Sequence, residues 1–102
     1  MRAAVLSDRG GPPQLVEFDA PKSSPGHELI DVRTAGLGGW DIVGAYQFAV
    51  NYPCVIRGEG VGIARDGRRV YFGERSVPPF GAWAEQTLVP SAEVWDVPAE
   101  AD

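Results

Sequence analysis

The stretch of sequence that decides the fold is VGIARDGRRVYF, residues 61–72. Two short runs containing apolar residues flank Asp66 and Gly67, and an Asp-Gly pair suits the positive φ angles of a type I′ turn between two strands. The stretch therefore predicts a β-hairpin, with one strand over residues 61–65 and the other over residues 68–72.

Working outward from this hairpin, the rest of the chain shows similarly short extended segments. Strands are predicted at residues 3–6 and 14–19, and an extended run at 83–89. In the strand predicted over residues 28–35, one side carries Ile30, Val32 and Thr34 and the other carries Asp31 and Arg33, which is the period of a half-buried strand. Thirteen glycines and nine prolines break the apolar residues into pieces too short for most helices. The chain is therefore predicted to be mainly β.

Helix is expected at one or two places. Residues 40–46 are the best candidate for a helical turn, because Asp41 can cap it and Trp40 can supply an apolar side. The polar tail after Val97 is a second place where a helix could start. Both helices would be short.

Length and composition exclude several classes of protein. The 102 residues suit a single domain, and 14 acidic against 9 basic residues give a net charge of −5. Without a run of basic residues, nucleic acid and anionic membranes are poor partners. Cys54 is the single cysteine, which excludes an internal disulfide and a cysteine-based metal cage. No apolar run is long enough for a signal peptide or a membrane span, so we expect a soluble, cytoplasmic protein.

Two glycine clusters occur, GLGG at residues 36–39 and GEGVG at residues 58–62. A dinucleotide fingerprint needs glycine at its first, third and sixth positions, but the sixth positions here are Asp41 and Ile63. A phosphate-binding P-loop needs a Gly-Lys-Ser/Thr ending, which neither cluster has. The clusters are therefore interpreted as backbone devices and not as phosphate loops.

The order and spacing of these fragments resemble the GroES-like domain of the medium-chain dehydrogenase/reductase superfamily. The resemblance covers nearly the whole chain and rests on MRAAV at residues 1–5, PGHELIDV at 25–32, Ala-Gly-Leu at 35–37, Pro53, Gly58, Gly62, GRRV at 67–70 and GAWAE at 81–85. It implies a mainly β, partly open barrel with one or two short helices, formed by residues 1–102 as a single domain. It also implies that a separate Rossmann domain, which is not in these 102 residues, holds the cofactor NADP(H).

The family's zinc-binding positions are changed in this sequence. In zinc-dependent members a cysteine stands where Gly38 stands here, and a Gly-His-Glu segment corresponds to Gly-Glu-Gly at residues 58–60. Zinc needs a set of thiolate, imidazole or carboxylate donors, and Glu59 alone cannot supply it. We therefore expect neither a catalytic nor a structural zinc. The zinc-free quinone reductase branch commonly has asparagine in the place of Gly38.

The resemblance assigns the first glycine cluster to the nicotinamide side of a cleft between two domains. Glycine lets the backbone come close to a flat ring, which suits Gly38 and Gly39. Glu59 of the second cluster is the third candidate for contact with the cofactor. The alternative for Glu59 is a solvated carboxylate in a glycine-rich turn.

The substrate wall is expected to include Trp40, Asp41 and Tyr46. The Tyr46 hydroxyl can protonate the substrate after hydride transfer, or its ring can cover an end of the barrel. Trp40 either stacks on the substrate or fills the core. Asp41 caps the helical turn or accepts a structural hydrogen bond.

Other reactive side chains have simpler interpretations. His27 is expected in a surface loop, and Cys54 as a small buried hydrophobe. Four arginines between residues 65 and 75 could bind a phosphate of the cofactor, but Asp66 and Glu74 beside them favour a solvated hairpin.

The function that these observations favour is that of the substrate-side catalytic domain of a zinc-independent, NADPH-dependent reductase of a quinone, enone or other activated carbonyl compound. Without its Rossmann domain, in the same enzyme or in a separate subunit, it would be inactive. One alternative is a stand-alone GroES-like module that binds a protein or small ligand without catalysis. Another keeps the enzyme and takes zinc ligands from outside this chain. A homodimer is also conceivable, through an apolar patch of Phe72, Phe80 and Trp83.

Overall fold

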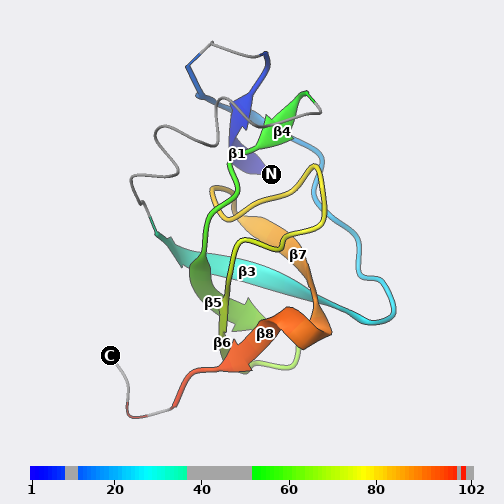
Figure 1. Cartoon of the computed structure of the whole chain (residues 1–102), viewed down its shortest axis with the longest axis vertical. Helices are drawn as coiled ribbons and strands as arrows, with labels where there is room; N and C mark the ends of the chain where they lie inside the picture. Colours follow the sequence, from blue (N-terminus) through cyan, green and yellow to red (C-terminus); the bar gives the residue numbers. More distant parts are fainter. Residues whose placement is uncertain (9–11, 37–51, 99, 101–102) are drawn as a thin grey trace.

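The computed structural model describes residues 1–8, 12–36, 52–98 and 100. Their regular secondary structure is almost entirely strand (Figure 1). The strands are β1 (Arg2–Leu6), β2 (Gln14–Glu17), β3 (His27–Ala35), β4 (Cys54–Val55), β5 (Gly60–Ala64), β6 (Arg69–Phe72), β7 (Gln86–Pro90) and β8 (Val94–Asp96). A single turn of 3₁₀ helix, η1 (Ser91–Glu93), precedes β8.

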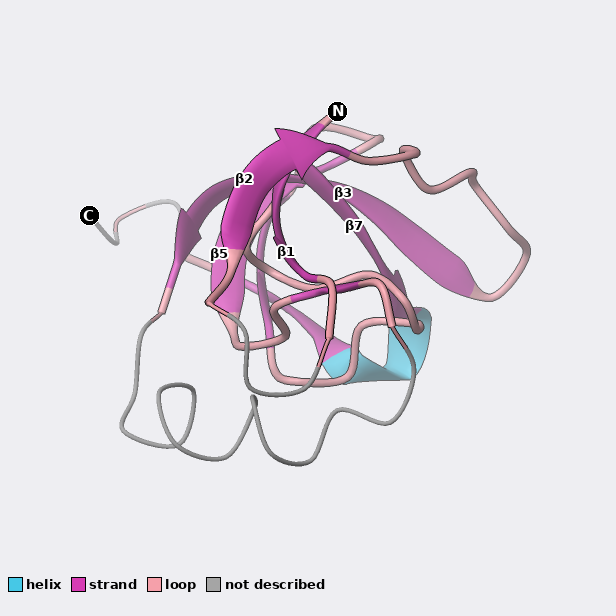
Figure 2. Ribbon diagram, turned by 90° about the horizontal axis from the view of Figure 1, so that it is seen from above, coloured by secondary structure: helices cyan, strands magenta, loops and turns pink. Residues whose placement is uncertain are grey.

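The strands form two antiparallel sheets. The smaller has the order β2-β1-β4 and the larger the order β7-β3-β5-β6-β8. The smaller sheet lies above the larger one in Figure 1, and the view from above shows the strands curling around a common interior (Figure 2). The prediction of a mainly β, partly open barrel is therefore confirmed.

Residues 82–85 join the two sheets. The Ala4 amide donates to the Trp83 carbonyl at 2.8 Å, which ties this segment to β1. The Val32 amide donates to the Glu85 carbonyl at 2.9 Å, which ties it to β3. The Trp83 side chain packs against the buried clusters of both sheets. The segment thus connects the two sheets through both backbone and side chain.

The core is divided between the two sheets. The cluster of the larger sheet consists of Ile30, Ala64, Val70, Phe72, Ala82 and Val89. The cluster of the smaller sheet consists of Ala3, Val5 and Val55. Deep inside the larger sheet, the hydroxyl of buried Thr87 donates to the Ser76 hydroxyl at 2.9 Å, so two buried polar groups satisfy each other.

The alternation predicted for residues 28–35 holds only in the first part of β3. Ile30 is fully buried and Val32 half-buried, but Thr34 is exposed and Ala35 packs against the core in its place. A β-bulge between Val32 and Thr34 shifts the register with β5. The extra residue inverts the alternation, so the expected inward face of Thr34 is wrong.

The predicted hairpin is confirmed as β5 and β6, but its turn is of another type. The Gly67 amide donates to the Ala64 carbonyl, and the Ala64 amide donates to the Arg68 carbonyl, each at 2.9 Å. Gly67 has a φ of 91°, whereas Asp66 does not have a positive φ. A type I′ turn needs positive φ at two residues. The loop is therefore a three-residue connection with glycine at its left-handed position, and the type I′ prediction is wrong.

The helix predicted at residues 40–46 cannot be compared with the described part of the chain. The helical turn expected at residues 40–46 lies outside the described residues, within which η1 is the only helix. No helix in this part of the chain is long and apolar enough to cross a membrane.

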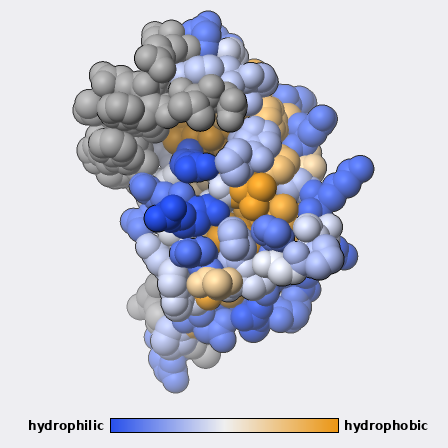
Figure 3. All heavy atoms as spheres, turned by 45° about the vertical axis from the view of Figure 1, so that its right-hand side comes forward, coloured by the Kyte–Doolittle hydropathy of each residue, from blue (hydrophilic) through white to orange (hydrophobic). Residues whose placement is uncertain are grey.

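The predicted apolar patch of Phe72, Phe80 and Trp83 does not form. Phe72 is completely buried, because it lies on the inward face of β6, and the other two side chains are half-buried. The exposed large apolar side chains of the described residues are instead Leu15, Val16, Tyr71 and Trp95. On the face shown in Figure 3, apolar residues occupy a limited area among hydrophilic ones.

The backbone around Gly62 is tightly packed, whereas Gly73 has open space beside it. A Cβ at Gly62 would lie 2.6 Å from Cγ2 of Ile30 and even closer to the Asp31 carbonyl oxygen, whereas a Cβ at Gly73 would meet nothing. We predict that Gly62→Ala lowers the free energy of unfolding by about 1–3 kcal/mol, because β3 must move away from β5. The matched control Gly73→Ala should change it by less than about 1 kcal/mol. Urea denaturation measures both, and equal effects would contradict the prediction.

Candidate functional site

The structure describes only part of the site that the sequence predicts. Five of the candidate residues lie outside the described ranges, namely Gly38, Gly39, Trp40, Asp41 and Tyr46. Glu59 is described, together with Gly36, the first residue of the other cluster. The described part of the candidate site is therefore the place where the two glycine clusters meet, at Gly36 and Glu59.

The two glycine clusters touch each other at this point. Gly36 follows the end of β3, and its amide donates a hydrogen bond to the Glu59 carbonyl, just before β5, at 2.8 Å. A Cβ at Gly36 would lie 3.0 Å from Cγ and 3.2 Å from Oε1 of Glu59. The Glu59 side chain thus lies across Gly36, and glycine leaves the space that the carboxylate occupies.

The Glu59 carboxylate is exposed but not free. The Tyr71 hydroxyl, which comes from β6, donates to Oε2 of Glu59 at 2.6 Å. Tyr71 in turn contacts Trp95 of β8, with ring centroids 6.0 Å apart and planes tilted by 38°. The interpretation of Glu59 as a merely solvated group therefore omits a short, charge-assisted hydrogen bond.

This hydrogen bond changes the acidity of the phenol. The pKa of Tyr71 is raised above its ordinary value, mainly because its hydroxyl donates to Glu59, and further by burial and by the negative charges of Glu59 and Glu74. Tyr71 was not among the site residues predicted from the sequence. The predicted two-residue turn would pair Tyr71 with Gly62, whereas the three-residue loop pairs it with Val61, two residues from Glu59.

Trp83 holds the other side of Gly36. Its indole Nε1–H donates to the Gly36 carbonyl at 3.2 Å. Gly36 is therefore fixed by Glu59 through its amide and by Trp83 through its carbonyl. Trp83 thus belongs to this site, and not to the surface patch in which it was expected.

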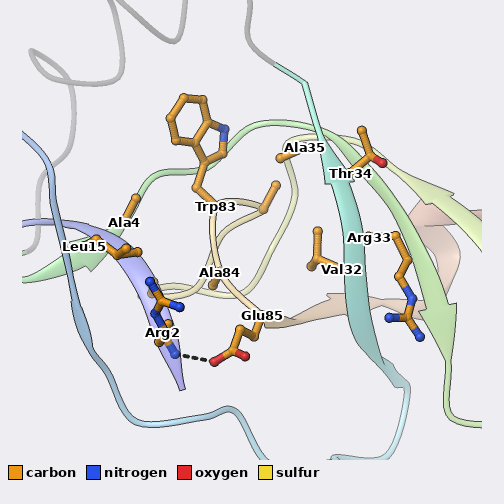
Figure 4. Close-up of a pocket in the computed structure, with 12 residues that line it drawn as sticks. Arg2, Ala4, Leu15, Val32, Arg33, Thr34, Ala35, Trp83, Ala84 and Glu85 are labelled. Carbon is orange, nitrogen blue, oxygen red and sulfur yellow. Dashed lines mark hydrogen bonds between the residues drawn. The ribbon is translucent and has the colours of Figure 1, made fainter.

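An open groove of about 560 Å³ lies below Trp83 (Figure 4). Ala4 and Leu15 of the smaller sheet line one wall, and Val32 and Ala35 of β3 line the other. Figure 4 shows that charged side chains also line it, namely those of Arg2, Arg33 and Glu85. The groove is mostly apolar, which suits the nonpolar part of a small organic molecule or a covering segment of protein.

The arginines of the hairpin do not form a phosphate site around Arg68. Its guanidinium bonds to Asp66 at 2.7 Å, to Asp96 at 2.8 Å and to Glu28 at 3.1 Å. The pKa of Asp66 is lowered, chiefly by the hydrogen bond from the Arg68 side chain. Three carboxylates occupy this exposed guanidinium, which confirms the solvated hairpin for this residue.

The remaining candidate side chains are metal ligands or reactive groups by residue type, and His27 and Cys54 are among them. The described residues contain no group of three or more His, Cys, Asp or Glu side chains that could hold a metal ion. His27 opens β3, half-buried, with Nδ1 3.0 Å from the Pro25 carbonyl, and so is not in a loop. Cys54 is half-buried and not fully buried, and burial raises the pKa of its thiol.

Comparison with known proteins supports the fold. The chain matches no protein-family model and no curated protein. It matches the quinone oxidoreductase from Thermus thermophilus, which was also solved with NADPH, with a TM-score of 0.81 and 29% identity. The match covers 100% of this chain and 34% of that chain.

Two further solved structures match over nearly the same extent. A mycobacterial protein complexed with NADPH gives a TM-score of 0.85 at 24% identity, over 100% of this chain and 35% of that one. The quinone oxidoreductase from Pseudomonas syringae pv. tomato gives 0.84 at 21% identity, over 99% and 34%. This chain thus spans about one third of the length of the proteins it matches, and it shares the fold of that part of them.

The Tyr71–Glu59 hydrogen bond can be tested by titration. We predict that Glu59→Gln lowers the pKa of Tyr71, because the largest cause of its elevation is removed, and that the control Glu74→Gln lowers it less. NMR of the Tyr71 ring carbons measures both values. A raised folded-state pKa stabilises the protein fully below the unfolded value of about 10, and this stabilisation is lost as pH rises through the folded value. An unchanged pKa in Glu59→Gln would contradict the hydrogen bond.

Proposed function

We propose that residues 1–102 form the substrate-side catalytic domain of an NADPH-dependent oxidoreductase that reduces a quinone, an enone or another activated carbonyl compound. The observation that carries this proposal is the match to the Thermus thermophilus quinone oxidoreductase, at 29% identity over the whole of this chain. That protein was solved in complex with NADPH. A separate cofactor domain would complete the enzyme, since this chain covers 34% of that relative.

The described residues suit the ring of NADPH better than its phosphates. The start of the site offers a glycine backbone at Gly36 and the carboxylate of Glu59, and a carboxylate repels a phosphate. The Arg68 guanidinium is already bonded to three carboxylates. We therefore assign the phosphates of the cofactor to the other domain. When bound, NADPH supplies the hydride for the reaction.

Glu59 is the residue of the described site with a direct electrostatic role in this proposal. Its carboxylate is held by Tyr71 over Gly36. A fixed negative charge stabilises positive charge that develops beside it, and it needs no reorganisation during the reaction. Donation of a hydride leaves positive charge on the donor ring, so a carboxylate at this wall favours the transfer.

The residues outside the described ranges keep the roles that the resemblance implies. Gly38 and Gly39 allow the backbone to approach the nicotinamide ring. In this proposal Tyr46 would donate a proton to the reduced substrate and Trp40 would stack on it, while Asp41 would act as a helix cap or as the acceptor of a structural hydrogen bond. The mostly apolar groove below Trp83 is in keeping with a nonpolar substrate.

We further propose that the enzyme works without zinc and in the cytoplasm. The support for zinc independence is the sequence, in which Gly38 occupies the position of a cysteine ligand and Gly-Glu-Gly at residues 58–60 replaces the Gly-His-Glu of zinc-dependent relatives. The single cysteine, which cannot form a disulfide within this chain, supports a reducing, cytoplasmic setting.

The division of labour between two domains gives the first prediction for this function. The complete reading frame that contains residues 1–102 should continue into a strand, a Gly-x-Gly-x-x-Gly loop and a helix, and its product should oxidise NADPH in the presence of a quinone. Residues 1–102 alone should show no turnover and no micromolar affinity for NADPH in calorimetry. Micromolar binding by this chain alone would contradict the division, and a stop codon after Asp102 would favour the non-catalytic binding module.

Metal content gives the second prediction. Protein purified without chelators should contain far less than one zinc ion per chain by elemental analysis. Prolonged dialysis against a chelator should leave NADPH oxidation by the complete protein unchanged, because no step depends on a metal. Stoichiometric zinc, or loss of activity that added zinc restores, would overturn zinc independence.

A further inference from the structure

The position of Tyr71 beside Glu59 is fixed by the core and not by the surface. Tyr71 pairs with Val61 across the hairpin, and the neighbouring residue Phe72 pairs with Gly60. Phe72 is completely buried, and a Cβ at Gly60 would lie 2.7 Å from its ring. A slip of one residue would expose Phe72, so the register is strongly specified. Burial of Phe72 therefore forces Tyr71 outward at the level of Val61, from which its hydroxyl reaches Glu59.

The Tyr71 ring is also supported from its other side. Tyr71 and Trp95 are directly paired residues of β6 and β8, and their rings lie 6.0 Å apart. Aromatic cross-strand pairs of this kind restrict each other's side-chain conformations. The Tyr71 side chain is thus held by the Trp95 contact at its ring and by the Glu59 carboxylate, at 2.6 Å, at its hydroxyl.

These contacts form a continuous path across the sheet. Trp95 contacts Tyr71, and Tyr71 donates to Glu59. The Glu59 side chain lies over Gly36, the Glu59 carbonyl accepts the Gly36 amide, and Trp83 holds the Gly36 carbonyl. Within the described part of the chain, the Tyr71 hydroxyl is the side-chain group that donates to the Glu59 carboxylate.

We propose that Tyr71 is a positioning residue, which holds the Glu59 carboxylate over Gly36 at the wall of the hydride-transfer cleft. This inference rests on the proposed function for its catalytic part. Removal of the hydroxyl frees Glu59 to rotate into solvent, because its side-chain donor among the described residues is lost. The carboxylate then no longer opposes the charge that develops during transfer, so turnover falls while substrate binding is preserved.

The positional part can be tested on residues 1–102 without cofactor. In Tyr71→Phe, the NMR signals of the Gly36 amide and the Trp83 indole N–H should shift, and the same signals should shift in Glu59→Gln. Tyr52→Phe is the matched control, because the buried Tyr52 hydroxyl makes no hydrogen bond within the described residues. Unchanged signals in Tyr71→Phe, or equal shifts in the control, would overturn the positioning role.

The catalytic part is tested in the complete protein. Tyr71→Phe should lower kcat for NADPH-dependent quinone reduction by roughly tenfold, with the KM for quinone unchanged. Glu59→Gln should have an effect of similar size, and the double variant should be no slower than the slower single variant, because the two residues act as one unit. Additive losses, or a change confined to KM, would overturn the proposal.

Failure of the proposed function would look different. A complete wild-type protein that reduces no quinone, enone or activated carbonyl with NADPH overturns the function and the catalytic part of this inference together. The shifts of Gly36 and Trp83 would still decide whether Tyr71 positions Glu59, since they need no activity.

Discussion

The fold and the candidate site both depend on the backbone hydrogen bonds of residues 82–85. This segment bonds to β1 through Trp83 and to β3 through Glu85, so it closes the space between two sheets that share no strand. The preceding residue explains why the chain takes this path. A Cβ at Gly81 would collide with the Ile56 carbonyl, so the segment can approach the small sheet only with glycine there. Trp83 then packs against both cores and reaches Gly36.

The positions of many strands were predictable, because one-sided burial imposes a period of two on strands such as β5 and β6. Ile30 and Val32 follow that period, and so does the β5–β6 hairpin. What the sequence could not indicate was a change of period within a strand. The bulge between Val32 and Thr34 depends on how β3 must bend to pair with β5, which is a property of the whole barrel. Likewise, Asp-Gly is compatible with two turn types, and the pairing of Ala64 with Arg68 selects between them.

The site was predictable only in part, for a related reason. Glu59 stood out as a carboxylate among glycines, but its partner lies on the neighbouring strand and has no motif of its own. The alternation of β6 contained the necessary information. Val70 and Phe72 face the core, so Tyr71 must face outward between them. A surface patch that includes Phe72 is incompatible with this period, and the same error hid Tyr71.

The charges of this chain bear on which part of the proposed cofactor it would contact. The chain carries a net charge of −5, and the guanidinium of Arg68 in its hairpin is surrounded by carboxylates. Such a surface gives little attraction to phosphates, which carry most of the charge of NADPH. Next to the glycine clusters, however, the Tyr71 hydroxyl holds the Glu59 carboxylate in place, so the Glu59 side chain loses conformational freedom. A negative charge fixed in that way has little value for binding an anionic cofactor, but it favours a ring that becomes positive as it gives up hydride. On the proposed function, this domain therefore contributes to the chemical step, and affinity for the cofactor resides elsewhere.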